Sequence, residues 1–335
     1  MAGFGDEIGD KLDRVARNSG FSGVVGIAEG GQPVVHAAYG LADRAHDVPN
    51  TVETRFAIAS GTKGFTALAV MALVEQGVLA QTTTARSLLG PDLPMIDDAV
   101  TIEHLLAHTS GIGDYLDESE GEIDDYVLTV PLHTLDSVEA WLPVLVGHAQ
   151  VSAPGLQFAY NNAGYVVLAL LAERAAGVPY AELVTRTVCD PAGLTHTSFH
   201  RSDTPAPDLA IGYLGDGPRM NVLHLPLVGA GDGGLSSTLT DLDRFWRALF
   251  AGRIVRTDTV AEMVRPHQHA PEHGLRYGLG FWLAASGPAV MLEGYDAGIS
   301  FRSTHDPVRH RTTTVISNTS EGAWPIARLL ADRAD

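Results

Sequence analysis

Patterns typical of β-strands lie at both ends of this 335-residue chain, and helical patterns lie between them. Residues 24–28 and 34–39 alternate around Glu29-Gly30-Gly31, which predicts a hairpin. The last hundred residues contain further strand patterns at 278–284, 289–293, 299–304 and 312–318. The simplest packing joins the two sets in one antiparallel sheet flanked by helices, an α+β fold with an inserted helical region.

The helical patterns place most of the inserted region in the first two thirds of the chain. Helices are expected at 6–18, from Ser60 to a glycine C-cap at Gly77, at 163–176, at 241–250 and from about 323 to 333, with short helices within 82–110. We expect a single unit over 1–335, with a sheet subdomain at about 1–60 plus 235–335 and a helical subdomain at about 61–234. Residues 112–152 are acidic and irregular and are predicted to cover a cleft.

Charge and cysteine content exclude several classes of function. The net charge of −18 argues against binding to nucleic acid or to an anionic membrane surface, because both kinds of binding require basic patches. Cys189 is the single cysteine and stands in an apolar context typical of a buried, inert thiol. The first residues lack a basic and an apolar leader segment, and no apolar run reaches membrane-spanning length, so a cytoplasmic protein is expected.

The placement of one lysine is the strongest chemical signal. Only two of the 22 lysine and arginine residues are lysines, and Lys63 follows Ser60 by three positions at the start of an apolar helix. Positions i and i+3 share a helix face, so the ammonium can reach the hydroxyl. Unlike arginine, a lysine can give up its proton when burial or nearby positive charge lowers its pKa. A capping serine beside an incidental lysine is the alternative reading of this pair.

A second signal is Tyr160-Asn161-Asn162, at a predicted loop-to-helix junction. A tyrosine there can act as a general acid or base when a lysine stabilises its phenolate. Asn162 can hold a substrate amide. Read alone, a tyrosine before a helix is more often a packing residue.

Four segments, in this order, make the chain resemble the penicillin-recognising serine hydrolases: class C β-lactamases, D,D-carboxypeptidases, D-aminopeptidases and related esterases. Residues 56–66 resemble the nucleophile helix with its S-x-x-K motif. Residues 101–112 are similar to T-I-x-x-L-L-x-H-T-S-G-[IL], residues 154–165 to P-G-x-x-F-x-Y-S-N-x-G-Y, and residues 230–242 to the A-G-G-L-x-S-T-x-x-D-L block.

The resemblance implies a role for each of these residues. Ser60 is the acylated nucleophile, Lys63 is the base that activates it, and Tyr160 transfers the proton to and from the leaving group. Asn162 matches the asparagine that contacts Lys63 and the substrate carbonyl. The implied enzyme transfers the acyl group of a small-molecule ester or amide to its serine, which gives an acyl-enzyme, and it needs no cofactor.

The chain departs from the family where a late strand carries K-T-G or H-x-G. Leu292-Glu293-Gly294 stands there, so only Gly294 matches, and the basic residue that binds the carboxylate of penicillins is missing. Glu293 is expected to repel such a carboxylate. By the alignment, the backbone N–H groups of Ser60 and Tyr295 form the oxyanion hole, and Asp296 either binds an amino group or caps a turn.

These observations favour the hydrolysis of small esters. The alternatives are a D-amino-acid peptidase or amidase, a weak β-lactamase, and a non-catalytic binding or sensor module. No metal site is expected, because His267, His269 and His273 lack a carboxylate or cysteine at metal-ligand spacing and read as a polar loop. Residues 231–234 lack the context of a nucleotide-binding loop.

Overall fold

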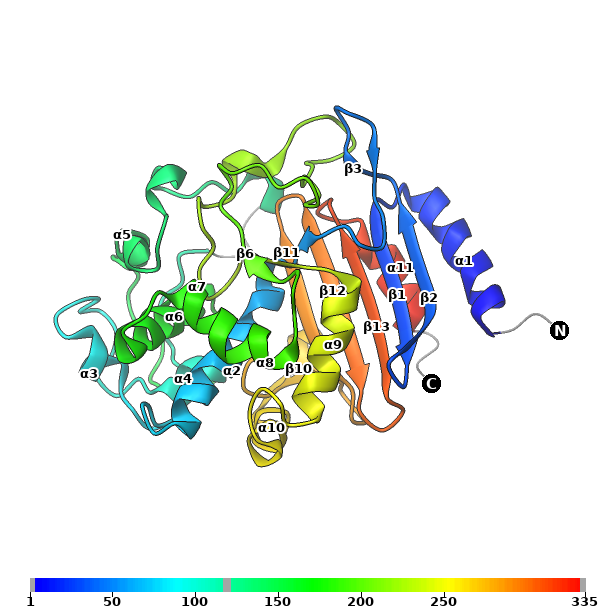
Figure 1. Cartoon of the computed structure of the whole chain (residues 1–335). Coiled ribbons are helices and arrows are strands. Elements are labelled where there is room, and N and C mark those ends of the chain that lie inside the picture. The colour runs from blue at the N-terminus through cyan, green and yellow to red at the C-terminus, as the bar shows by residue number, and fades with distance from the viewer. Residues whose placement is uncertain (1–3, 117–121, 332–335) are drawn as a thin grey trace.

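An eight-stranded antiparallel sheet joins the two ends of the chain in a computed structural model that describes residues 4–116 and 122–331 (Figure 1). The strand order is β2-β1-β13-β12-β11-β10-β9-β8. The strands are β1 (Gly23–Glu29), β2 (Gln32–Tyr39), β8 (Gln268–Ala270), β9 (Leu275–Tyr277), β10 (Trp282–Leu283), β11 (Val290–Asp296), β12 (Ile299–Asp306) and β13 (Arg311–Ser317). The predicted α+β fold is confirmed.

The pairing of β1 with β13 joins the N-terminal strands to the C-terminal strands in one sheet. The register runs from Gly23 opposite Ser317 to Glu29 opposite Arg311. Val24 and Val25 point to opposite faces, because side chains alternate along a strand. Val24 joins the large core, and Val25 joins a smaller cluster on the other face.

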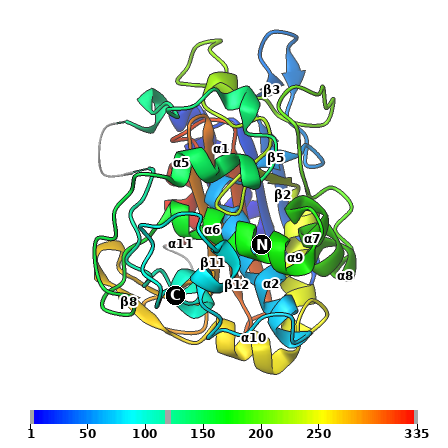
Figure 2. The same cartoon turned by 90° about the vertical axis from the view of Figure 1, so that its left-hand side faces the viewer.

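Helices cover both faces of this sheet. α1 (Phe4–Ser19) and α11 (Ala323–Ala331) cover one face, where Leu12 and Ile326 pack with Val25 of β1. α2 (Thr62–Glu75), α6 (Asn162–Ala176) and α9 (Leu239–Phe250) lie on the other side (Figures 1 and 2). α2 is buried along nearly its whole length between the sheet and α6, which explains its predominantly apolar sequence.

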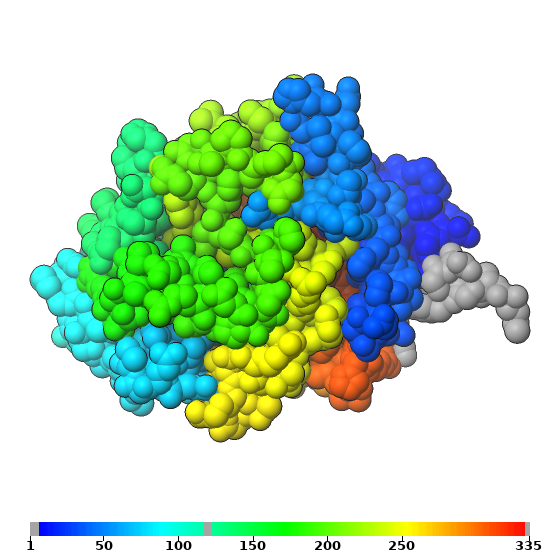
Figure 3. All heavy atoms as spheres, viewed as in Figure 1, coloured from blue at the N-terminus to red at the C-terminus, as the bar shows by residue number. Residues whose placement is uncertain are grey.

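Shorter elements complete the helical part and the cleft. The helices are α3 (Ala85–Leu89), α4 (Ile102–Leu106), α5 (Leu142–Leu145), α7 (Tyr180–Val184), α8 (Asp190–Ala192) and α10 (Thr257–Met263). The small sheets pair β3 (Leu41–Asp43) with β4 (Val48–Pro49), and β7 (Leu235–Ser237) with both β5 (Phe56–Ala57) and β6 (Ser198–Phe199). In Figure 3 the segment that contains α7 to α10, coloured green to yellow, runs from the middle of this face to its lower edge.

Two sequence predictions at the sheet edge are wrong. The strand expected at 278–284 is only Trp282–Leu283, because Gly280 has a φ of 87° that interrupts an extended run. The histidine-rich segment is not a polar loop throughout, since Gln268–Ala270 forms β8 and pairs with β9. These strands are too short to carry an alternating signal, and their neighbours in the sheet define them.

Two other predictions extend beyond the described residues. The terminal helix is described to Ala331, so its predicted end near residue 333 lies outside them. The irregular segment 112–152 is found as loops with short helical turns, except for residues 117–121, which also lie outside. Nothing tests the two predicted subdomains, which stay a prediction. None of the described helices has the length and apolar character needed to cross a membrane.

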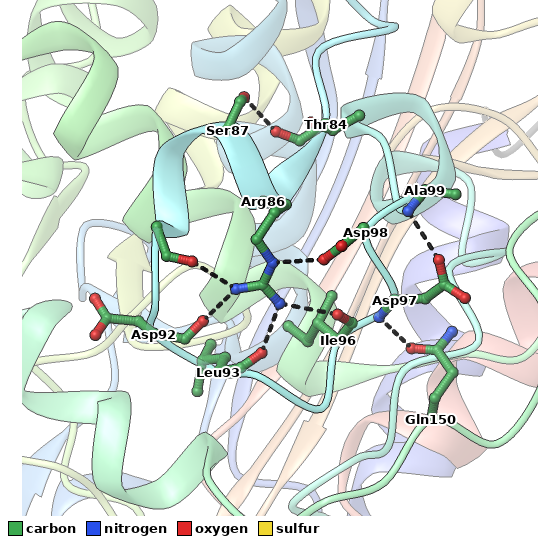
Figure 4. A network of polar contacts seen from close by, with 11 residues as sticks. Thr84, Arg86, Ser87, Asp92, Leu93, Ile96, Asp97, Asp98, Ala99 and Gln150 are labelled. Atoms are coloured by element: carbon green, nitrogen blue, oxygen red, sulfur yellow. Dashed lines mark hydrogen bonds and ion pairs between the residues drawn. The ribbon is translucent and has the colours of Figure 1, made fainter.

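The loop after α3 is organised around one arginine (Figure 4). The guanidinium of Arg86 donates to the backbone carbonyls of Gly90, Asp92, Leu93 and Ile96 and to the Asp98 carboxylate, at 2.8–3.0 Å. A single side chain therefore satisfies the carbonyls of a loop that contains no regular element.

Candidate active site

Ser60 lies in a tight 3₁₀ turn, Ala59–Gly61, between β5 and α2. Ala59 has a φ of 43°, a conformation that is costly for a residue with a side chain. Thr62 holds the turn by donating from Oγ1 to the Ala59 carbonyl at 2.7 Å and accepting the Leu235 N–H at 3.1 Å. Ser60 itself remains partly exposed.

Lys63 is buried beneath Ser60, with 2% of its surface exposed. Its Nζ donates to Ser60 Oγ at 2.8 Å, to Asn162 Oδ1 at 2.7 Å and to the Asp232 carbonyl at 3.1 Å. An ammonium group has three protons for these three acceptors, whereas a neutral amine donates two protons, to Asn162 and Asp232, and accepts the third hydrogen bond from Ser60 Oγ. The structure thus brings two residues from distant parts of the sequence, Asn162 and Asp232, to the predicted Ser60–Lys63 contact.

Tyr160 lies against this group just before α6. The Lys63 Nζ is 4.9 Å from the centre of its ring, within cation–π range. The ring also stacks on Trp282, with centroids 5.6 Å apart and planes at 14°, and contacts His108 at 4.5 Å. The two neighbouring asparagines have different roles. Asn162 contacts Lys63, and Asn161 caps α6 by accepting the Gly164 N–H.

His108 anchors the segment that carries Tyr160. Its Nδ1 accepts the Asn161 N–H at 3.1 Å, so Nε2 carries the proton and donates to Tyr277 Oη at 3.2 Å. Burial, and then the charge of Lys63, holds the pKa of His108 well below its usual range. The neutral imidazole therefore acts as a fixed spacer in this aromatic cluster.

Asp114 binds the N-terminus of α6 from the irregular segment. Its carboxylate accepts the N–H of Asn162 at 2.6 Å and that of Ala163 at 2.9 Å. Burial raises the pKa of Asp114 to about 6, while the backbone donors and the charge of Lys63 act in the opposite direction. Asp114 thus fixes the backbone of the residue whose side chain contacts Lys63.

Strand β11 lies directly against the Ser60 turn. A Cβ on Gly294 would lie 2.0 Å from the Ile58 carbonyl oxygen and 3.1 Å from the Gly61 nitrogen, so only glycine permits this approach. Leu292 faces the same side and packs on Gly64 of α2 with 2% of its surface exposed. A buried leucine therefore occupies the position where the alignment expects a basic residue.

The expectation that Glu293 acts at the site is wrong. Alternation along β11 turns Glu293 to the opposite face of the sheet, where it pairs with Arg302 of β12, which lies near Trp324 of α11. The Tyr295 side chain also points there, with its ring 6.0 Å from that of Trp324. Asp296 faces the cleft, and its Oδ1 accepts the Ala297 N–H at 2.8 Å, as expected for a turn cap.

A cavity of about 150 Å³ opens beside the Ser60 turn. Ala59, Asp232 and Asp296 line it, together with apolar side chains that include Leu128 and Trp141. Tyr115 donates its phenol proton to the Asp232 carboxylate at the wall. No lysine or arginine is among the described residues that line this cavity.

The family model described as Beta-lactamase matches residues 11–334. The chain belongs to the Beta-lactamase family. Its members are serine hydrolases, and the prediction that this chain is a serine hydrolase is thereby confirmed.

Relatives within the Beta-lactamase family carry different names. The chain is 30% identical over 280 residues to "Putative penicillin-binding protein PbpX" of Bacillus subtilis, a match covering 82% of this chain and 65% of that protein. It is 36% identical over 196 residues to "Esterase EstB" of Burkholderia gladioli, covering 56% and 50%. A solved penicillin-binding protein from Bacillus halodurans is 33% identical with a TM-score of 0.89, covering 96% of this chain and 99% of that one.

Several residues of this Beta-lactamase family site carried no clear sequence signal. Trp282 contacts Tyr160 from a two-residue strand, and the Asp232 backbone carbonyl contacts Lys63 from a loop. Asp114 belongs to the acidic segment 112–152, which was predicted only to cover a cleft. Among the described residues, no group of three or more His, Cys, Asp or Glu side chains could hold a metal ion.

Proposed function

We propose that this protein hydrolyses small esters through an acyl-enzyme on Ser60. The observation that carries the proposal is the 2.8 Å contact between Lys63 Nζ and the partly exposed Ser60 Oγ, in a site where the amine is buried. A serine hydroxyl is a weak nucleophile until a base in hydrogen-bond reach takes its proton. No other described lysine lies near this serine, since Lys11 belongs to α1 on the far face of the sheet.

The first step forms a tetrahedral adduct on Ser60. With Lys63 neutral, the proton in the Ser60–Lys63 hydrogen bond lies on Ser60 Oγ and passes to Nζ as Oγ bonds to the substrate carbonyl carbon. The carbonyl π electrons move to oxygen, and the backbone N–H groups of Ser60 and Tyr295 are proposed to stabilise that oxyanion. The close approach of Gly294 to Gly61 supports this assignment, because it brings the backbone next to Tyr295 against the turn.

The tetrahedral adduct then collapses. The ester C–O bond breaks as Tyr160 Oη donates a proton to the departing alkoxide, and Lys63 returns its proton to Tyr160. In deacylation, Tyr160 passes its phenol proton to neutral Lys63 and takes a proton from water as the water oxygen attacks the acyl carbon. The new tetrahedral adduct collapses as the C–O bond to Ser60 breaks, and Ser60 Oγ takes the proton back from Lys63, which restores the starting state.

An ester is favoured over a penicillin or a peptide with a free carboxylate. The side chain at position 292 is a buried leucine, and the cavity beside Ser60 contains Asp232 and Asp296 without a lysine or arginine in its described lining. A substrate carboxylate would be repelled there. The 36% identity with a protein named as an esterase also supports this substrate class.

Hydrolysis of small amino-acyl amides is the second candidate. Asp296 lines the cavity with a carboxylate oriented by the Ala297 N–H, and a carboxylate is a suitable partner for a substrate amino group. Amide and ester hydrolysis differ here in the leaving group, which Tyr160 must protonate in either case.

The test is intact mass after incubation with a fluorophosphonate, with turnover of p-nitrophenyl acetate measured in parallel. We expect one adduct per wild-type chain, no adduct in Ser60→Ala, and turnover at least about 10³-fold lower in that variant. Ser87→Ala, on an exposed surface, is the matched control. Lys63→Arg should also lose turnover, because arginine cannot deprotonate. A folded wild type without adduct or turnover would leave a non-catalytic binding module.

A further inference from the structure

The cavity beside the Ser60 turn touches three parts of the proposed machinery. Ala59 precedes Ser60, and Asp296 follows Tyr295, the proposed oxyanion donor. The backbone carbonyl of Asp232 accepts from Lys63, while its side chain lines the cavity. A substrate group in this cavity would therefore be only a few bonds away from a carbonyl carbon held at Ser60.

Tyr160 is not among the described residues that line the cavity. Since Tyr160 is the proposed proton donor to the leaving group, the leaving group departs on its side of the site. The cavity then receives the other substituent of the carbonyl carbon, which is the acyl part of the substrate.

Size and lining define the apolar part of that acyl group. A cavity of about 150 Å³ with apolar walls holds a molecule of benzene's size. Leu128, Leu209, Pro226 and Ile299 supply such walls here. An acetyl group would leave most of this volume unfilled.

The charge of the cavity indicates a second feature of the acyl group. Asp232 and Asp296 both lie in its lining. Their effect reaches Tyr126, whose pKa is raised to about 12, first by burial and then by the charges of Asp114, Asp232 and Asp296. In a partly enclosed apolar site such a potential attracts a cation.

Trp141 provides an independent indication of a ligand. It lines the cavity with only 3% of its surface exposed, and its indole N–H has no hydrogen-bond partner among the described residues. A buried donor without an acceptor is costly, and an aromatic face can act as a weak acceptor for it. This favours an aromatic ring over an aliphatic group of equal size.

Resting on the proposed function, we propose that the cavity is the acyl subsite and that it takes an aromatic side chain next to a protonated amine. The substrate class is thus an ester or amide of an aromatic 2-amino acid. The ring would lie among the apolar walls beside Trp141, and the ammonium group would bind between Asp232 and Asp296.

The test compares kcat/KM for methyl esters that share one leaving group. The acids are phenylalanine in both enantiomers, alanine, and 3-phenylpropanoic acid, which lacks the amine; each value is divided by the ester's rate of hydroxide-catalysed hydrolysis. We expect the better phenylalanine enantiomer to exceed both other esters by at least about 10-fold. Asp296→Asn should bring the ratio of phenylalanine to 3-phenylpropanoate close to one.

Two further variants address the ring. Leu128→Trp should lower the ratio of phenylalanine to alanine at least about 5-fold by filling the cavity, and Trp141→Phe should lower it about 2-fold by removing the donor. Asp258→Asn, at an exposed site, is the matched control. An unchanged amine preference in Asp296→Asn would overturn the inference, provided that the wild type shows p-nitrophenyl acetate turnover and labelling. A wild type without turnover and labelling would overturn the proposed function instead.

Discussion

The indole of Trp282 stacks on the phenol ring of Tyr160, with their planes at 14°. Trp282 belongs to β10 at the edge part of the sheet, whereas Tyr160 precedes α6 in the helical part. The stack therefore holds Tyr160, the proposed proton donor, in place beside Lys63 and connects the sheet with the helical part. The aromatic cluster around it includes Tyr277 and Phe158.

Replacement of Trp282 should affect the chemical step more than binding. In Trp282→Ala, Tyr160 loses one stacking face, and we expect kcat for p-nitrophenyl acetate to fall about 10-fold with KM nearly unchanged. Trp282→Phe keeps a ring in place and should restore most of kcat. Steady-state kinetics on samples with native circular dichroism would measure this. A loss confined to KM, or no rescue by phenylalanine, would contradict the positioning role.

Ionisation of Asp114 should make the native state less stable as the pH rises. Burial raises its pKa from the usual 3.8 to about 6, so the folded state retains the proton longer than the unfolded chain. The stability contribution is fully present below about pH 4 and is lost as the pH passes through about 6, a change of about 3 kcal/mol. Urea unfolding between pH 4 and pH 7 should show this difference between wild type and Asp114→Asn. Parallel curves for the two proteins would exclude it.

His305 should produce a pH dependence of the opposite sign. Burial lowers its pKa to about 4, with Asp243 and Asp306 acting in the other direction, and its ring stacks on Trp246 and Phe250. The unfolded chain then binds the proton first, so stability is fully present above about pH 6.5 and is lost as the pH falls toward 4, by about 3 kcal/mol.

His305→Phe preserves the stacking and removes the titrating group. The slope of unfolding free energy against pH between 4 and 6.5 should therefore flatten in this variant. The Thr312 hydroxyl loses its contact with Nδ1 in the variant, which shifts the whole curve without changing its slope. A slope equal to that of wild type would show that His305 does not titrate in this range.

Arg86 should be replaceable only at a cost in stability. Its guanidinium binds four backbone carbonyls in different directions, and a lysine ammonium cannot reach them together (Figure 4). We expect Arg86→Lys to lower the free energy of unfolding by about 2 kcal/mol. Arg186→Lys is the control, because that side chain is 61% exposed and its pair with Glu182 spans one helical turn. Equal effects of the two changes in denaturant unfolding would contradict this account.

The elements that could be predicted from the sequence are those with a strong signal among neighbouring residues. The hairpin at the N-terminus, the buried α2 with its lysine and the capped α6 follow from apolar patterns and cap residues within short runs of neighbouring positions. The Ser60–Lys63 contact was predictable for the same reason, since three positions separate the two residues. The family resemblance extended this to Tyr160 and Asn162, which no local pattern places beside Lys63.

The direction in which the side chains of β11 face, and the surroundings of the site, depend on tertiary contacts and could not be predicted from the sequence. The pairing of β11 with β12 and its contact with the Ser60 turn send Leu292 and Gly294 toward α2 and turn Glu293 away to Arg302. A shift of one residue would exchange those faces, and the sequence of one strand does not fix that register. The cavity is lined by Ala59, Asp232 and Asp296, which come from three distant segments. Burial and electrostatic interactions depend on distance in space, and the sequence alone does not show which distant residues meet.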